Sequence, residues 1–416
     1  MSEKLSTDSL AIVLLCTSLA LPSRSEKSIK PLTPSEWEGV SEKLQRQQLR
    51  PSVFFEQPSS FWNDALDLGH DFVERIEHLL ARGAQLAFEL ERLDSLGIWV
   101  KTRAEHDYPI QWKRRLRQKS PVVVFGVGNT SLLLDNNERI AIVGSRDIDE
   151  EALKFTETLA TQCATDGMAV VSGGARGVDM TAQTTALNVG GTVISVVSEG
   201  LEGTVKKREI RNAVLSGNLL MLSAVAPRMR FTAHNAMARN KYVYTLSHYS
   251  VVVSSSLKGG TWSGAVENLR NHWIPLFVRD SEKMPAGNQP LILQGGISFP
   301  EGQLYKRTMP LSEWFSAHKR TESFPIEEIR VKQVDIVAQV QADIFPVVLP
   351  IMKKMLSSPK SIAELAKNLN VMEQQVAMWV QKATEGGYVK QLPQSNLIVD
   401  VNYSPSRQIS LFDTES

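Results

Sequence analysis

Cysteine is scarce in this sequence. The 416 residues include two cysteines, Cys16 and Cys163, which lie far apart. Two such residues form neither a metal-ligand spacing nor a disulfide framework, and this usage suits a reducing compartment. We therefore expect a cytoplasmic protein with no metal site.

Apolar runs long enough to span a bilayer are also missing. The segment 10–21 is apolar but too short for a membrane-spanning helix. Its length fits the core of a secretory signal, yet Glu3 and Asp8 accompany a single Lys4, whereas such signals have a positive flank. We expect this run to form a buried helix of an N-terminal domain, with no membrane association.

The chain has no excess of one charge. It contains 46 Lys and Arg against 45 Asp and Glu, which gives a formal net charge of +1. Overall charge therefore does not indicate a nucleic-acid partner, and a polyanion would have to bind a local group of basic residues. The length favours two or three domains, and a hydrophobic content of 42% is ordinary for a folded protein.

Short apolar runs that alternate with helical patterns occupy the middle of the chain. The first run, 140–143, ends at Gly144, as expected of a strand buried on both faces. This alternation predicts an α/β fold with a Rossmann-like parallel sheet and right-handed crossovers. Further strands are expected at 168–171, 192–197, 219–222, 250–253 and 274–278, with helices at 153–164 and 233–246.

The segments on either side of this sheet have helical spacing. Before it, short helices separated by Gly69, Gly83 and Gly97 predict a small, SAM-like helical domain. After it, two short helices and a strand pair predict a winged helix. The expected divisions are a helical domain at 1–115, the Rossmann-like domain at 116–318, a linker at 319–345, the winged-helix domain at 346–403 and a disordered tail at 404–416.

Three loops that follow predicted strands combine glycine with basic residues, namely 144–146, 172–179 and 258–264. Ligands of open parallel sheets bind beyond the carboxyl ends of the strands. Glycine lets backbone N–H groups approach a phosphate, and arginine and lysine add full charges. Together with basic residues of the helix at 233–246, the candidate phosphate-binding residues are Gly144, Ser145, Arg146, Ser172, Gly173, Gly174, Arg176, Gly177, Arg239, Asn240, Lys241, Lys258, Gly259, Gly260 and Thr261.

Each loop also has a plainer interpretation. Gly144 is compatible with a simple turn, and Asp147 and Asp149 beside it would repel an anion. The third loop is compatible with a glycine-rich turn on which Trp262 packs. Asp179 fits a helix cap, or a partner that orients an arginine, better than it fits a catalytic acid.

The familiar patterns of enzymes are missing. The sequence shows no Ser/His/Asp arrangement, no paired-acid spacing and no metal-ligand cluster. The GxGxxG turn of dinucleotide-binding proteins does not follow Val143. We therefore expect neither catalysis nor a cofactor.

At these loops the sequence resembles the DNA-processing protein A (DprA/Smf) family. The resemblance rests on IAIVGSR, VVSGGARGVDMTAQTTAL, ARNKYVYTLS and VVVSSSLKGGTWSGA, in the family's order across about residues 85–300. It implies a Rossmann-like domain behind a helical one, single-stranded DNA as ligand, homodimerisation and delivery of DNA to a RecA-type recombinase. The DNA-binding positions that it implies are Ser145, Arg146, Gly173, Arg176, Arg239, Asn240, Lys241, Lys258 and Gly260.

The chain departs from the family pattern in places, which marks it as a divergent member. The segment after Gly200 reads LEGTVKKREIRN, without the usual Tyr-Pro pair. A role in natural transformation, phage defence or genome maintenance stays open. The alternatives are a nucleotide-binding sensor, or a nucleotide-cleaving enzyme of the wider superfamily; for the latter, Lys258 replaces a proline and Glu267 falls one position late.

Overall fold

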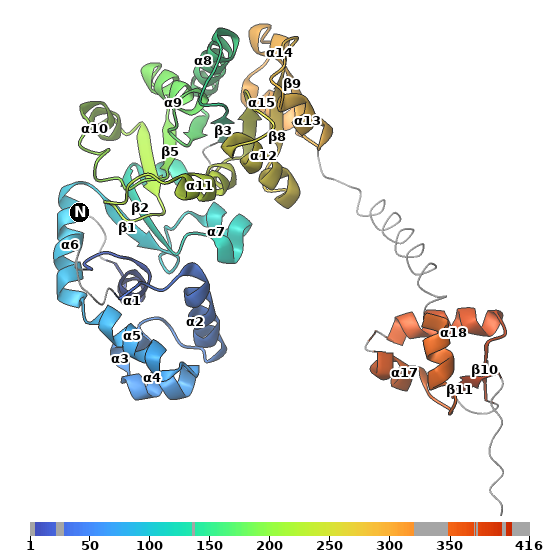
Figure 1. Cartoon of the computed structure of the whole chain (residues 1–416). Helices are drawn as coiled ribbons and strands as arrows, with labels where there is room; N and C mark the ends of the chain where they lie inside the picture. The colour runs from blue at the N-terminus through green and yellow to red at the C-terminus, as the bar shows by residue number, and fades with distance from the viewer. Residues whose placement is uncertain are drawn as a thin grey trace, which may run out of the picture. The chain divides into compact units, whose positions relative to one another are not determined.

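The computed structural model of the chain describes residues 5–21, 29–134, 138–319, 348–369, 371, 373–392 and 397–401. The chain divides into two compact units, Met1–Arg320 and Thr321–Ser416 (Figure 1). The predicted tail at 404–416 and all but the first residue of the predicted linker at 319–345 lie outside the described residues. Across the described ranges, no helix has the length and apolar character needed to cross a membrane.

Helices form the first part of the larger unit. Residues 10–16 of the apolar run belong to the first of them, and residues 11–15 are buried, as predicted, whereas residues 17–21 lie beyond the end of this helix. The second begins with a capping box, in which Thr33 and Glu36 each accept the other's backbone N–H. The helices are α1 (Thr7–Cys16), α2 (Pro34–Arg46), α3 (Val53–Glu56), α4 (Ser59–Leu66), α5 (His70–Leu80) and α6 (Gly83–Ser95).

A sheet is the centre of this unit, and nine strands of the described chain form it in the order β1-β2-β6-β5-β4-β3-β7-β8-β9. The strands from β3 to β9 all run parallel to one another, whereas β2 is antiparallel to both β1 and β6. The predicted Rossmann-like parallel sheet is confirmed. The strands are β1 (Trp99–Thr102), β2 (Val123–Gly128), β3 (Arg139–Val143), β4 (Ala169–Ser172), β5 (Val193–Val197), β6 (Leu219–Ser223), β7 (Tyr249–Val252), β8 (Leu276–Asp280) and β9 (Ile297–Pro300).

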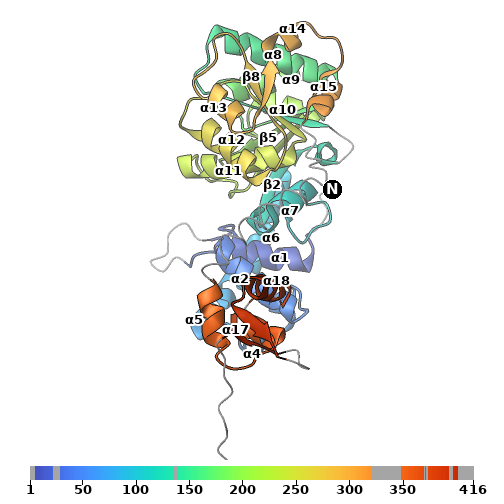
Figure 2. The same cartoon turned by 90° about the vertical axis from the view of Figure 1, so that its right-hand side faces the viewer.

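Helices cover both faces of the sheet. Successive strand residues point to opposite faces, so Ile140 and Ile142 join one core while Ala141 and Val143 join the other. In Figure 2, α8 and α9 lie on one side of the strands and α11 and α12 on the other. The helices of this part are α7 (Ile110–Leu116), α8 (Glu150–Thr165), α9 (Val178–Asn188), α10 (Arg208–Leu215), α11 (Ala233–Leu246), α12 (Gly260–Asn271), α13 (Asn288–Leu293), α14 (Glu301–Tyr305) and α15 (Leu311–His318), with the 3-10 turns η1 (Arg117–Lys119) and η2 (Thr130–Leu133).

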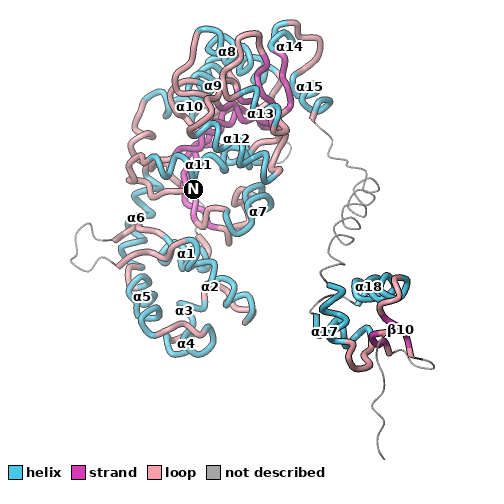
Figure 3. Tube along the Cα trace, turned by 45° about the vertical axis from the view of Figure 1, so that its right-hand side comes forward, coloured by secondary structure: helices cyan, strands magenta, loops and turns pink. Residues whose placement is uncertain are grey.

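The helical N-terminal segment shares its core with the sheet. Figure 3 shows α1 to α5 gathered at one end of the sheet, and α1 packs against β1 and β2. The prediction of an all-helical segment 1–115 misses β1, whose residues 99–102 pair with β2. Val100 and Thr102 are buried while Lys101 between them is not, and this alternation is too short to stand out in the sequence.

The smaller unit contains the helices and hairpin that the sequence predicts for its winged helix. Residues 348–355 are helical, followed by α17 (Ile362–Leu369) and α18 (Glu373–Glu385). The strands β10 (Val389–Gln391) and β11 (Ile398–Asp400) then pair in antiparallel fashion. Met352, Leu365, Val376 and Ala383 form a separate core with their neighbours.

Candidate functional site

Three adjacent strands, β4, β3 and β7, carry the three glycine-rich loops at their carboxyl ends. From β3 the chain builds the sheet in one direction through β4, β5 and β6, and it then crosses to β7 on the other side of β3. The boundary between β3 and β7 is therefore a topological switch point, where ligands of open α/β sheets bind. The predicted convergence of the loops is thus produced by the strand order.

Hydrogen bonds tie the three loops together. The Val178 N–H donates to the Ser145 carbonyl at 3.2 Å, which joins the second loop to the first. The Thr261 hydroxyl donates to the Gly144 carbonyl at 2.8 Å, which joins the third loop to the first. Gly177 has φ +84°, and a Cβ there would overlap the Ser145 carbonyl, so this contact between loops requires glycine.

A pocket of about 440 Å³ lies where the loops meet the helix α11. We call it the three-loop pocket. The predicted site residues that line it are Gly144, Ser145, Arg146, Arg239, Asn240, Lys258, Gly259, Gly260 and Thr261. Other lining residues include Ala175, Asp179, Phe231, Met237, Tyr244 and Ser256.

The helix α11 contributes a buried arginine to this pocket. The Arg239 Nη1 atom lies 3.8 Å from the Asp179 Oδ2 atom, so Asp179 orients an arginine, as expected of it. Asp179 also accepts the Gly173 N–H at 3.1 Å. The Arg239 guanidinium packs directly on Gly173, where a Cβ would overlap it. Burial lowers the pKa of Arg239 and raises the pKa of Asp179, and in each case the partner's charge opposes the shift.

Two cations of the three-loop pocket form no ion pair with any described residue, namely Arg146 and Lys258. The Arg146 guanidinium lies over the Phe231 ring, 5.7 Å from the ring centroid. Phe231 is itself 52% exposed. Lys258 is exposed at the start of the third loop. These two side chains supply positive charge that an incoming anion can reach.

Several predicted residues lie elsewhere. Arg176 does not line the pocket. Its guanidinium forms an ion pair with Asp147 at 2.5 Å on the surface, so a carboxylate next to the first loop partly neutralises the positive charge expected of Arg176. Ser172 is buried and donates its hydroxyl to the Ile142 carbonyl. Lys241 points into a different pocket, on the other side of α11. The predicted residues that the three-loop pocket does not include are Ser172, Gly173, Gly174, Arg176, Gly177 and Lys241.

Sequence reasoning missed some lining residues. Phe231 is an exposed aromatic residue just before α11. Its position in the sequence next to basic residues could have indicated a nucleic-acid-binding residue. Tyr244 lines the pocket with a buried hydroxyl that has no hydrogen-bond partner in the described chain. Its burial becomes apparent only in the folded chain, because the helical pattern of α11 does not reveal which side faces the sheet.

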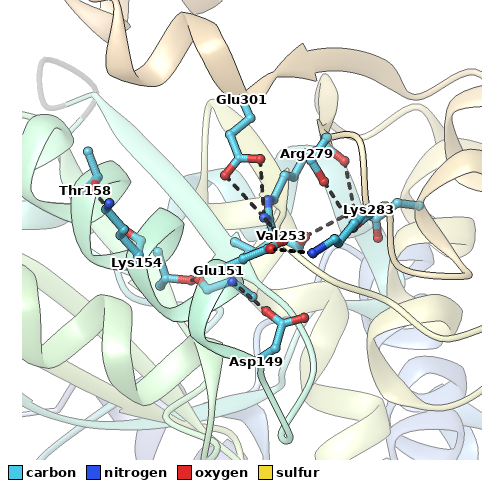
Figure 4. Close-up of polar contacts among 12 residues, drawn as sticks. Asp149, Glu151, Lys154, Thr158, Val253, Arg279, Lys283 and Glu301 are labelled. Atoms are coloured by element: carbon cyan, nitrogen blue, oxygen red, sulfur yellow. Dashed lines mark hydrogen bonds and ion pairs between the residues drawn. The ribbon is translucent and has the colours of Figure 1, made fainter.

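A cluster of polar side chains around Arg279 connects α8 to the end of β7, beside the site (Figure 4). The buried Arg279 of β8 lies 3.2 Å from Glu301 and 3.9 Å from Glu151 of α8. Asn288 donates both to the Arg279 carbonyl and to the Val253 carbonyl at the end of β7. This cluster therefore holds α8 and the third loop's strand in place, and its carboxylates are engaged by protein groups.

Glu267, the acidic residue considered for the nucleotide-cleaving alternative, lies outside the three-loop pocket. Its side chain is half-buried on α12. Among the described residues, no group of three or more His, Cys, Asp or Glu side chains is placed to hold a metal ion.

A doubly wound sheet with cationic, glycine-rich loops at its switch point defines the Rossmann-like class of α/β proteins. Residues 99–298 match the sequence model of the family described as DNA recombination-mediator protein A. Over these residues, slightly less than half of the chain, the sequence is similar to the DprA/Smf family.

Known relatives are similar over much of the chain. The DNA processing protein DprA of Streptococcus pneumoniae is 29% identical over 53% of this chain and 76% of its own length. The Smf protein of Escherichia coli is 27% identical over 75% of this chain and 85% of its own. The X-ray structure of DprA from Streptococcus pneumoniae superposes with a TM-score of 0.50 at 21% identity, covering 67% of this chain and 98% of that one, and it supports the fold.

Proposed function

We propose that this protein binds single-stranded DNA by its backbone at the three-loop pocket and serves DNA processing or recombination. The observation that carries this proposal is the meeting of Arg146 and Lys258, both without an ion-pair partner among the described residues, at a switch point lined by glycine. Loops of this kind offer backbone N–H donors as well as full charges. The match of residues 99–298 to a family model described as DNA recombination-mediator protein A supports the same ligand class.

The pocket's shape favours a single strand. A volume of about 440 Å³ is that of a small-molecule site, and a double helix is too wide to enter it. A single strand can turn individual phosphates inward and leave its bases to contact exposed rings. Phe231 offers such a ring beside Arg146. The charges address the backbone, so we expect little dependence on base sequence.

Fluorescence anisotropy with labelled dT20 and with a duplex of equal length tests this proposal. The variant Arg146→Ala/Lys258→Ala should bind dT20 at least about tenfold more weakly, because charge-assisted contacts to phosphate are lost. The matched control is Lys154→Ala/Lys306→Ala, which removes two exposed lysines at α8 and α14.

Thermal unfolding verifies that each variant is folded. A folded Arg146→Ala/Lys258→Ala variant with the control's dT20 affinity would remove the three-loop pocket from the DNA site. A wild type that binds mononucleotides but no oligonucleotide would favour the nucleotide-sensor alternative.

We also propose that the protein acts by binding rather than catalysis, forms a homodimer and passes DNA to a RecA-type recombinase in the cytoplasm. The similarity to the DprA/Smf family supports these proposals, and the two free thiols, Cys16 and Cys163, suit a reducing compartment. We also propose the domain divisions that the sequence predicts, after residues 115, 318, 345 and 403. Light scattering measures the dimer, and a pull-down of a purified recombinase by the DNA-loaded protein measures the partnership.

A further inference from the structure

A second pocket, of about 630 Å³, lies between the N-terminal helices and the sheet. We call it the α2–α11 pocket. The start of α2, the segment that joins η1 to β2, the loop after β6 and the helix α11 all contribute to it. Its lining includes Glu38, Lys119, Val122, Phe125, Lys241 and Tyr242.

Two lysines give this pocket its charge. Lys241 is half-buried, and burial is the main cause of its lowered pKa. Glu267 opposes this shift, whereas the positive charge of Lys119 lowers the pKa further. The two ammonium groups are therefore close enough to repel each other. Neither forms an ion pair with a described residue. Glu38 is the one carboxylate among the described lining residues.

The remaining lining is apolar and partly aromatic. The Lys241 ammonium lies 5.2 Å from the centroid of the Tyr242 ring. Tyr242 is itself held by Trp112, whose indole N–H donates to the Tyr242 carbonyl at 3.0 Å and whose ring lies 5.2 Å away. Two neighbouring ammonium groups beside an aromatic ring held in place and an aliphatic wall suit a ligand that has both a phosphate and a flat apolar group.

The helix α11 separates this pocket from the three-loop pocket. Arg239 and Asn240 face the three-loop pocket, while the next two residues, Lys241 and Tyr242, face the α2–α11 pocket. A helix with its side chains is about 10–12 Å across, so the two pockets are separate sites that one flexible strand can reach together.

We propose that the α2–α11 pocket is a second nucleotide site, in which Lys119 and Lys241 bind a phosphate and the apolar wall with Tyr242 accommodates the base. The nucleotide has two possible sources, the continuing DNA strand or a free nucleotide. The strand source rests on the proposed DNA binding at the three-loop pocket, whereas the free-nucleotide source does not.

The test compares four full-length proteins: wild type, Lys119→Gln/Lys241→Gln, Arg146→Ala/Lys258→Ala and the control Lys154→Gln/Lys306→Gln. Each is titrated with dT20 by anisotropy and with dTMP by calorimetry. If the strand fills the pocket, Lys119→Gln/Lys241→Gln should bind dT20 about tenfold more weakly than the control. If a free nucleotide fills it, the same variant should lose dTMP binding that Arg146→Ala/Lys258→Ala retains.

Each outcome separates this proposal from the function proposed above. A wild type that fails to bind dT20, with dTMP binding lost only on Lys119→Gln/Lys241→Gln, would contradict the DNA function and support the second site. Should the folded Lys119→Gln/Lys241→Gln variant match the control with both probes, the second site is wrong. Lys119 is exposed and Lys241 half-buried, so glutamine is tolerated sterically, and thermal unfolding confirms folding.

Discussion

The guanidinium of Arg239 and the carboxylate of Asp179 lie 3.8 Å apart, and each side chain is only 9% exposed. Burial lowers the pKa of Arg239 and raises the pKa of Asp179, and the partner's charge opposes each shift. The pair connects α11 to the second loop, because Asp179 also accepts the Gly173 N–H.

We expect Arg239→Gln or Asp179→Asn alone to lower the free energy of unfolding by about 3–5 kcal/mol, because the remaining charge is buried without a partner. The double variant should lose clearly less than the sum of the two, since neither charge remains. Urea denaturation of the three variants gives the coupling energy. Additive losses would contradict a direct interaction.

Arg176 should contribute less to DNA binding than Lys258 does. Its guanidinium is paired with Asp147, and both side chains are largely exposed, so its charge is already partly compensated. We expect Lys258→Ala to reduce the slope of log affinity against log salt by about 0.7, the value for one phosphate contact of a single strand. Arg176→Ala should change that slope less. Anisotropy with dT20 at a series of salt concentrations measures both, and equal slopes would refute this ranking.

Gly177 should be intolerant of any side chain. Its positive φ and its contact with the Ser145 carbonyl both exclude a Cβ. We expect Gly177→Ala to destabilise the protein by more than about 1 kcal/mol and to weaken dT20 binding, because the first two loops separate. Gly302→Ala in α14 is the matched control, since a Cβ there meets nothing within 4 Å. The prediction fails if both variants melt at the wild-type temperature.

The Glu36 carboxylate should make the N-terminal helices sensitive to acid. Arg75 donates to it at 2.7 Å, and this hydrogen bond with that of the Thr33 N–H lowers the pKa of Glu36 to about 2. A depressed pKa stabilises the fold at neutral pH, and that stabilisation is lost as pH falls from about 4.5 to about 2.

The thermal midpoint of Glu36→Gln should therefore be lower than that of the wild type at pH 7, with the difference shrinking below pH 4. Glu42→Gln is the control, because its ion pair with Arg46 is exposed and spans 3.7 Å. A difference between wild type and Glu36→Gln that is independent of pH would show that the carboxylate's charge is not involved.

The central strands could be predicted because each is a continuous apolar run buried on both faces. The strand β2 was missed because Gly126 and Gly128 interrupt its pattern. In the folded chain the Trp99 ring of β1 lies on Gly126, where a Cβ would overlap it, so this glycine accommodates a neighbour distant in sequence. Patterns within one segment do not contain such information.

The candidate site could be predicted only in part, for a similar reason. Glycine next to Arg146 and Lys258 indicated phosphate-binding loops from local chemistry alone. Whether a cation remains available depends on which carboxylate reaches it, as Asp147 reaches Arg176. The direction of Lys241, away from the three loops, depends on how α11 packs on the sheet.

Local sequence thus determined where buried strands run and that three of them end in glycine-rich, basic turns, because periodicity and backbone freedom are properties of neighbouring residues. Tertiary structure decided that Arg239 is buried against Asp179 while Arg146 and Lys258 remain without an ion-pair partner in the described chain. Burial and ion pairing depend on groups that only folding brings together, so the charge of the site is a property of the folded chain.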